Sequence, residues 1–461
     1  MAIKSFELEP TRENLMTTLM NDLLGRNESV WQFARFCDSQ EGKCSIAVDA
    51  KWGQGKTFFV RHVQLLLSAF NENTDSVSDV ERDTIKQVFG KYKGSGTDEV
   101  ELQPQVCVYY DAWANDNADD PILSLIYEII KDTAQHYSIK KSTDCINAAA
   151  IISDFFTGKN AAEVVASLRG KDILSELKNQ KEIHETIADF LESLLFEQGN
   201  RLVVFIDELD RCKPSYAVKL LERIKHYFSN DRITFVFSVN TDELQHVIMS
   251  YYGDGFNAYK YLDRFFDYRI ALPPAKLNGY YQHIGLADGM WVYESVCKAV
   301  IETYSFSLRE LEKYYRMARV AAYEATHNQR FYDFSDENAL SFSLHIVVPI
   351  IIGLRMIDAK LYNDFIAGNN PQPLIDVIGD RDIARGICST LLDKNETYAD
   401  SVENRTTVKL QDKLCLAYAA LLKDSSRTEW GEKRIGSCLF TQRTKNVTLQ
   451  VSSLLSNYAS Y

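Results

Sequence analysis

The sequence predicts an α/β fold in which a parallel sheet with a helical insertion is followed by an all-helical C-terminal part. Three observations lead to this fold class. An apolar run, a glycine-containing loop and a helical pattern follow one another over residues 44–67. A second apolar run ends in two acids at residues 202–208, and beyond residue 275 apolar residues recur at helical spacing. We therefore expect a core domain over 1–275, with the insertion at about 138–199, and a helical domain over 276–461.

The composition is that of a folded, acidic protein. Of the 461 residues, 46% are hydrophobic and 12% aromatic, which is enough for sizeable cores. The net charge of −13 argues against a protein that binds nucleic acid with its whole surface, although it leaves room for a local basic patch. Nine cysteines without a CxxC pair fit buried thiols in a reducing cytosol better than a disulfide framework or a zinc site.

The sequence gives no sign of export or membrane insertion. Glu7, Glu9 and Arg12 are unlike the start of a signal peptide. The most apolar stretch, Ile346–Leu354, is too short to span a bilayer and is followed by Arg355. We expect a soluble, cytoplasmic protein.

Residues 11–40 predict two helices. Leu15, Leu19 and Leu23 share one helical face, and the pattern stops at the turn Leu24–Asn27, which contains Gly25 and Arg26. Gly25 could be an ordinary helix C-cap. The turn could equally flank the base of a bound nucleotide if a phosphate site follows.

Residues 44–67 predict a phosphate-binding loop (P-loop), because a β-branched run leads through glycines into a helix. Gly53 and Gly55 allow the backbone to curl around an anion, and the positive end of the helix dipole favours phosphate. Lys56 supplies a charge for the β- and γ-phosphates, and the Thr57 hydroxyl is placed to ligate Mg²⁺. The usual pattern begins with glycine, where this chain has Ala50, so the start of the loop is expected to differ slightly. The residues expected at the nucleotide are Trp52, Gly53, Gln54, Gly55, Lys56, Thr57 and Phe58.

Between the P-loop and the apolar run that ends in two acids at 202–208, polar and apolar segments alternate. Residues 71–104 are polar and predict a surface excursion. A strand is expected at 106–110, and a helix begins at Pro121. Residues 140–198 predict the helical insertion, which ends at Gly199.

The second motif is the apolar strand 202–206, followed by Asp207 and Glu208. Open α/β sheets place ligands at the carboxyl ends of their strands, so these acids are expected at the site. Asp207 would hold Mg²⁺, and Glu208 would orient and deprotonate the attacking water. The alternative is a solvated start of a loop. Asp210 and Arg211 follow, and we expect them to form a supporting ion pair.

Two more strands are expected at 233–239 and 268–272. The first ends at Asn240, whose amide could sense the γ-phosphate or hold the lytic water. It could equally cap the helix predicted over 242–250. Helices are then expected at roughly 288–303, 307–326, 337–358, 374–392 and 405–423, with a kink at Pro349 in the third.

With these motifs placed, the sequence resembles the KAP family of P-loop NTPases over residues 20–315. The resemblance depends on WGQGKT at Trp52–Thr57, YYDAW at Tyr109–Trp113, IDELDRC at Ile206–Cys212 and YLDRFF at Tyr261–Phe266, with SLREL at 307–311 in addition. It implies the strand order 5-1-4-3-2 and a helical lid. Many relatives carry membrane-spanning helices between the two Walker motifs, but here that interval carries charged residues, including Asp154 and Arg169.

The resemblance also gives a meaning to two arginines and to Trp52. Arg264 lies where related ATPases often carry an arginine finger that reaches a neighbouring subunit. The alternative is an ion pair with Asp263 or Asp267. Arg309 resembles a sensor-2 arginine of the lid, or is a surface arginine beside its glutamates. Trp52 would shield the phosphates or pack under the lid.

The sequence as a whole predicts a Mg²⁺-dependent ATPase with ATP and Mg²⁺ as ligands, forming a homo-oligomer. In one hypothesis, hydrolysis drives repeated conformational change in an assembly. In the other, slow hydrolysis sets the state of a switch that recruits a partner protein through the C-terminal helical domain. Bacterial relatives are often linked to phage exclusion or plasmid functions. Neither a membrane nor a nucleic acid is predicted as a partner.

Overall fold

The computed structural model describes residues 9–92, 101–118, 120–137, 188, 190–192, 194–196, 198–228, 230–286, 292–327, 337–379, 382–398, 405–423 and 432–454. The chain falls into two units, which divide between Tyr280 and Tyr281. Most of the predicted insertion at 138–199 lies outside the described residues.

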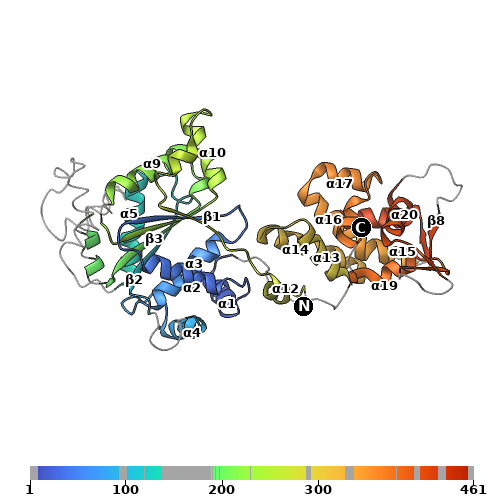
Figure 1. Ribbon diagram of the computed structural model, residues 1–461, viewed down its shortest axis with the longest axis horizontal. Coiled ribbons are helices and arrows are strands. Elements are labelled where there is room, and N and C mark those ends of the chain that lie inside the picture. Colours follow the sequence, from blue (N-terminus) through green and yellow to red (C-terminus); the bar gives the residue numbers. More distant parts are fainter. Residues whose placement is uncertain are drawn as a thin grey trace. The chain divides into compact units, whose positions relative to one another are not determined.

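The N-terminal unit is built on a five-stranded parallel sheet (Figure 1). The order β2-β3-β4-β1-β5 confirms the predicted order, read from the other edge. Because every pair is parallel, the carboxyl ends of the strands share one edge of the sheet. In register, Asp111 of β2 pairs with Asp207 of β3, and Asp207 with Ser238 of β4. The strands are β1 (Cys44–Asp49), β2 (Gln105–Asp111), β3 (Arg201–Asp207), β4 (Ile233–Val239) and β5 (Tyr268–Ala271).

Helices cover both faces of this sheet, so its central strands are apolar on both sides (Figure 1). Val204 and Ile206 belong to the core that packs against α5, α9 and α10. Their neighbours Val203 and Phe205 belong to the core on the other face, against α1 to α4. The helices are α1 (Arg12–Met20), α2 (Asn27–Asp38), α3 (Lys56–Ala69), α4 (Asp79–Gly90), α5 (Pro121–His136), α9 (Pro214–Tyr227), α10 (Thr241–Tyr252) and α11 (Ala258–Leu262), with a 3₁₀ turn η3 (Leu209–Arg211).

The polar excursion predicted at 71–104 is wrong in part, because α4 forms within it. Ser78 and Glu81 form a reciprocal capping box, which satisfies the first free N–H groups of the helix. Ile85 and Phe89 are buried and pack toward Trp31 on α2. This helix therefore forms despite its few apolar residues, because the capping box fixes its start and one narrow apolar face packs into the core.

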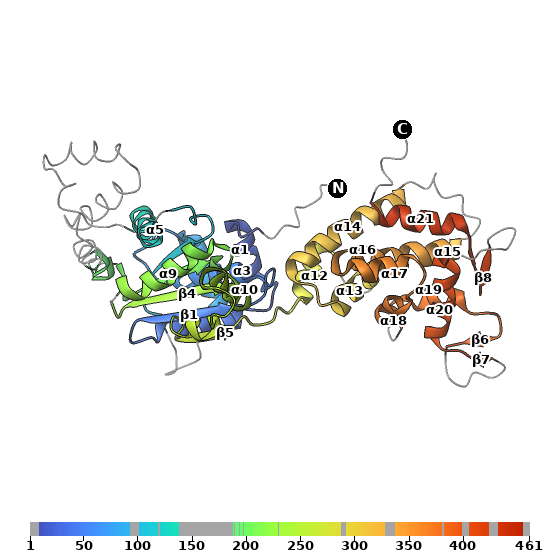
Figure 2. The same cartoon turned by 90° about the horizontal axis from the view of Figure 1, so that it is seen from above.

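The C-terminal unit is mainly helical, and α14, α16 and α21 pack against one another in it (Figure 2). It also contains two small two-stranded sheets, β6–β7 and β8–β9, which the sequence did not predict. Its elements are α12 (Asn278–Ile284, across the division), α13 (Val292–Thr303), α14 (Leu308–His327), α15 (Glu337–Phe342), η5 (Ser343–Val347), α16 (Val348–Ile357), α17 (Ala359–Ile366), α18 (Gln372–Ile378), η6 (Asp382–Ala384), α19 (Arg385–Cys388), η7 (Ser389–Leu391), β6 (Glu396–Thr397), β7 (Thr406–Thr407), α20 (Leu410–Leu422), β8 (Lys433–Ile435), β9 (Cys438–Phe440) and α21 (Gln442–Ser452).

Three of the predicted helices differ in this unit. The helix expected at 405–423 begins only at Leu410, as α20, because the short strand β7 occupies Thr406–Thr407. The single helix expected at 374–392 is wrong: α18 ends before Gly379, and short helical turns follow from Asp382. The disturbance expected at Pro349 takes the form of a π-helical turn, η5, in which the Val348 N–H bonds to the Ser343 carbonyl. A proline has no N–H and crowds the preceding turn, so a wider turn accommodates it.

The helical run Glu337–Ile357 is long and apolar enough to cross a bilayer by length and composition. Most of it is buried within the protein, as in the core helix of a soluble domain, so it is weak evidence for a membrane span. None of the eight cysteines among the described residues forms a disulfide, and seven of the eight are buried.

Candidate functional site

The P-loop has the backbone that its sequence predicts. Gly53 and Gly55 adopt left-handed φ angles of 78° and 85°, which other residues reach only with strain, and α3 begins directly after them. Ala50 has no positive φ, and its N–H bonds to the carbonyl of Val239 at 3.2 Å. The missing first glycine therefore costs this loop nothing.

The lysine and threonine of the loop face different partners. The Lys56 ammonium donates to the carbonyl of Ala50 at 2.6 Å, inside its own loop. Burial lowers the pKa of Lys56, while Asp210 and Asp207 act in the opposite direction. The Thr57 hydroxyl donates to the Asp207 carboxylate at 2.6 Å. The structure thus joins the two residues expected to hold Mg²⁺.

Glu208 lies next to this pair in a strained conformation. Its φ of 61° and ψ of 23° are left-handed, which costs a residue other than glycine about 1–3 kcal/mol. Its carboxylate forms an ion pair with Arg211. Burial, and then Asp207, raise the pKa of Glu208 to about 7. A carboxylate with such a pKa suits general-base work near neutral pH.

The ion pair expected between Asp210 and Arg211 is wrong. Asp210 is buried and accepts a hydrogen bond from the Trp52 indole N–H at 2.5 Å, as well as from the backbone N–H of Asn240. Trp52 therefore ties the P-loop to the end of β3, and 44% of its surface is exposed. Burial raises the pKa of Asp210.

Two residues at the site were not predicted, Tyr109 and Arg61. The Tyr109 hydroxyl donates to the same oxygen of Asp207 that Thr57 contacts, at 2.9 Å. The Arg61 guanidinium lies 3.3 Å from the centre of the Tyr109 ring. Tyr109 belongs to the YYDAW segment near the carboxyl end of β2, the strand beside β3. This position is the sequence feature that could have predicted its contact with Asp207.

The turn before α2 reaches the P-loop through Arg26. This buried guanidinium donates to the carbonyl of Gln54 at 3.0 Å, and burial lowers its pKa to about 10. Gly25 has a φ of 60° and is not a helix C-cap, because α1 already ends at Met20. The C-cap interpretation is therefore wrong, and contact with adenine stays a prediction.

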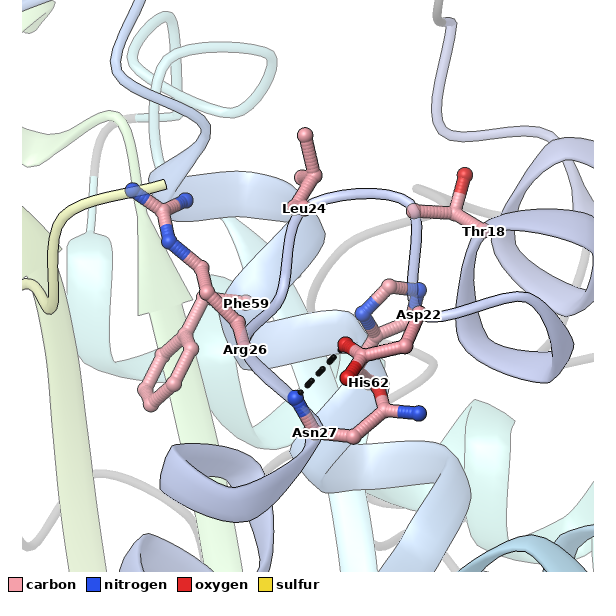
Figure 3. A pocket seen from close by; sticks show the side chains of 7 residues that line it. All are labelled: Thr18, Asp22, Leu24, Arg26, Asn27, Phe59 and His62. Atoms are coloured by element: carbon pink, nitrogen blue, oxygen red, sulfur yellow. Dashed lines mark hydrogen bonds between the residues drawn. The ribbon is translucent and has the colours of Figure 1, made fainter. Parts of the chain in front are cut away.

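Arg26 also lines a cavity of about 10 Å³, which Figure 3 shows with its guanidinium turned away from Asp22, Asn27 and His62. His62 accompanies it in a neutral form, because burial lowers its pKa to about 4, and its ring contacts the Leu15 carbonyl at 3.0 Å. A space of this size holds about one water molecule, so it is no base pocket.

Of the remaining predicted residues, Asn240 touches this cluster through its backbone N–H. It directly follows β4, and its side chain does not cap α10. Arg264 is exposed at the amino edge of the sheet, beside a cavity of about 290 Å³ that Lys43 and Lys225 also line. Neither acid proposed as its partner holds it: Asp263 pairs with Arg269, and Asp267 accepts from the Ser45 N–H.

Phe58 and Arg309 complete the set. Phe58 is buried on α3, edge-on to His62. Arg309 is exposed in the second position of α14, in the C-terminal unit. The Glu310 beside it accepts from the Ser307 N–H, so the SLREL segment forms a capping box at the start of this helix.

The residues of this site fit a nucleotide with Mg²⁺. The glycine conformations form an anion cradle, and Lys56 supplies a cation that donates to the Ala50 and Lys51 carbonyls of its own loop. Thr57 and Asp207 offer a hydroxyl and a carboxylate oxygen to one ion. Mg²⁺ at phosphates typically takes few protein ligands, and within the described part of the chain no group of three or more His, Cys, Asp or Glu gathers as a metal cage.

Comparison with known families agrees with this geometry. The model of the KAP family P-loop domain matches residues 32–285, which is more than half of the chain. The chain belongs to the KAP family of P-loop NTPases. A comparison with curated proteins gives no significant match.

Solved structures also resemble this KAP-family chain. An ORC2 protein of Aeropyrum pernix, in ADPNP–ADP complexes, is 14% identical with a TM-score of 0.29, covering 97% of this chain and 95% of that one. A Drosophila ORC bound to GC-rich DNA and Cdc6 is 10% identical with a TM-score of 0.31, covering 89% and 57%. Likenesses this distant carry no argument about function.

Proposed function

We propose that this chain binds ATP with Mg²⁺ and hydrolyses it by attack of water on the γ-phosphorus. The observation that supports this most is the contact of Thr57 with Asp207 at 2.6 Å, directly beside Glu208, at the carboxyl edge of the sheet. A phosphate site and a base candidate thus come from two separate stretches of sequence.

Each side chain has a separate task in this proposal. Lys56 leaves the Ala50 carbonyl and binds the β- and γ-phosphates, while Thr57 and Asp207 would hold the Mg²⁺. When bound, the metal neutralises charge that develops on the phosphates. Glu208 accepts the proton of the attacking water, and Asn240, at the end of the next strand, orients that water or senses the γ-phosphate.

In this proposal the ATPase cycle drives conformational change in a homo-oligomer, with Arg264 acting on a neighbouring subunit. The support is the exposure of Arg264 together with the occupation of both nearby acids by other groups. Arg309 would contact the γ-phosphate from the helical lid. A guanidinium suits both tasks because its charge is fixed and it can bind two oxygens at once.

The second candidate is a slow switch that recruits a partner protein through the C-terminal unit. The observations that favour it are the hydrogen bond of Lys56 to its own loop and the ion pair of Glu208 with Arg211. A cytoplasmic setting and an anti-phage or plasmid-linked role are hypotheses based on the resemblance. An affinity pull-down with the Glu208→Gln protein would identify the partner.

Steady-state ATPase assays over a range of protein concentration separate the two candidates. A finger in trans contributes about 10³–10⁵ in rate, so the rate per subunit should rise on self-association. Arg264→Ala should abolish most turnover and leave ATP affinity unchanged, while Arg269→Ala, which removes the ion pair with Asp263, serves as the matched control. Mixing Arg264→Ala with Glu208→Gln should restore activity at sites that combine an intact Glu208 with a neighbour's Arg264. No rescue, with a protein that stays monomeric in ATP, contradicts the trans finger and favours the switch.

A further inference from the structure

One arginine connects the base candidate to two tryptophans. Arg211 forms an ion pair with Glu208 through its Nε and the Oε2 of the carboxylate. Its guanidinium lies 5.8 Å from the centre of the Trp52 ring and 5.6 Å from that of Trp113. These distances are within reach of cation–π attraction. The arginine thus has three aromatic or charged neighbours, from three different segments of the chain.

The local backbone explains why Glu208 needs such a partner. Glu208 precedes the single 3₁₀ turn η3 in a left-handed conformation, and Arg211 ends that turn three residues later. A strained residue keeps its conformation only where its surroundings fix it. Among the contacts of the described residues, the Arg211 Nε engages Oε2 of Glu208. The ion pair therefore fixes the direction of the carboxylate at the end of β3.

The tryptophans hold Arg211 from two loops. Trp52 belongs to the P-loop and is itself held by Asp210, whereas Trp113 follows β2. Both indoles are about half exposed, at 44% and 53%, so packing in the core does not account for them. A movement of either loop would therefore shift the Arg211 guanidinium, and with it the Glu208 carboxylate that Arg211 contacts.

We propose that Arg211 is a positioning residue for Glu208, and that Trp52 and Trp113 hold Arg211 in place for this task. The inference rests on the proposed function, because it takes Glu208 as the general base. Arg211 does not touch the reacting atoms. It directs the Glu208 carboxylate toward the attacking water.

The kinetic test compares Arg211→Ala with the wild type and with Arg211→Lys. Misplacement of a catalytic group by about 1 Å can cost about 10²-fold, so kcat should fall by about that factor, with the Kd for Mg·ATP within about twofold. Lysine keeps the charge and should recover about a tenth of the wild-type rate. In a Glu208→Gln background, Arg211→Ala should have no further effect. The control is Arg223→Ala, which loses an ion pair with Asp120 elsewhere in the same unit.

A second readout needs no turnover. In the nucleotide-free protein, Arg211→Ala and Glu208→Gln should each change the tryptophan emission, and replacing both Trp52 and Trp113 by Phe should remove most of that change. Unchanged emission in Arg211→Ala contradicts the placement between the indoles. Turnover of Arg211→Ala within twofold of wild type, or an equal loss in the Glu208→Gln background, overturns the positioning role. If instead Glu208→Gln itself keeps wild-type turnover, the base in the proposed function is wrong and the inference falls with it.

Discussion

Glu208→Gln should make the metal-free protein more stable at neutral pH, although it removes the proposed base. The carboxylate is buried beside Asp207, and its pKa rises from the ordinary 4.5 to about 7. The native state therefore binds this proton more tightly than the unfolded state does. As pH rises from about 4.5 to about 7, the unfolded state loses the proton first, so the stability of the wild type falls through this window.

The size of the effect follows from the same pKa. The difference between 4.5 and about 7 corresponds to about 3 kcal/mol. Because 21% of the side chain is exposed, solvent screening reduces the expected gain to about 2 kcal/mol. Glutamine keeps the shape and does not ionise, so the two proteins should be equally stable near pH 4.5. The gap opens as pH rises and is constant above about pH 7.

Urea denaturation in EDTA at several pH values measures this difference. Glu243→Gln, on the exposed side of α10, controls for loss of a surface carboxylate. A gap that does not depend on pH would show that burial of the Glu208 charge is not its cause. A Glu208→Gln protein less stable than wild type at pH 8 would refute the reasoning.

Three further changes test other parts of the site. Lys56→Ala should abolish Mg·ATP binding in calorimetry, because the phosphates lose their cation; unchanged affinity would remove the P-loop assignment. Tyr109→Phe should lower the free energy of unfolding by about 1.5–3 kcal/mol, since Asp207 loses a charged hydrogen bond, whereas Tyr110→Phe loses only neutral ones. Equal losses in the two variants would count against the Tyr109 contact. Gly25→Ala should cost at least about 1–2 kcal/mol, because φ is 60° and the new Cβ would lie 2.6 Å from the Lys276 Cβ; thermal unfolding close to wild type would disagree with this geometry.

The sheet and its two motifs could be predicted because their signals are local. β-branched runs ending in glycines or acids identify β1 and β3 without knowledge of the rest of the chain. The helix α4 was missed because its polar composition outweighed its capping box at Ser78 and Glu81, which the sequence does contain. The broken helix at 374–392 was missed because apolar spacing there continues past the point where the backbone turns.

The partners within the site were harder to predict, because they come from residues far apart in the sequence. Tyr109 reaches Asp207 only because β2 and β3 are adjacent and in register. Arg211 pairs with Glu208 because the 3₁₀ turn brings side chains three positions apart close together. The neighbouring Asp210 points toward Trp52 instead and accepts its indole N–H. Residue type and spacing predict which groups gather at an edge, and only the fold shows which pairs form.

The most direct test of the central claim is a single-turnover measurement of Mg·ATP hydrolysis by the wild type and by Glu208→Gln, with ATP affinity measured in parallel. We predict that both proteins bind Mg·ATP equally and that hydrolysis slows by about 10²–10⁴-fold in the variant. Equal rates of hydrolysis in the two proteins, or no hydrolysis by the wild type at any protein concentration, would contradict the assignment of this site as an ATPase with Glu208 as its base.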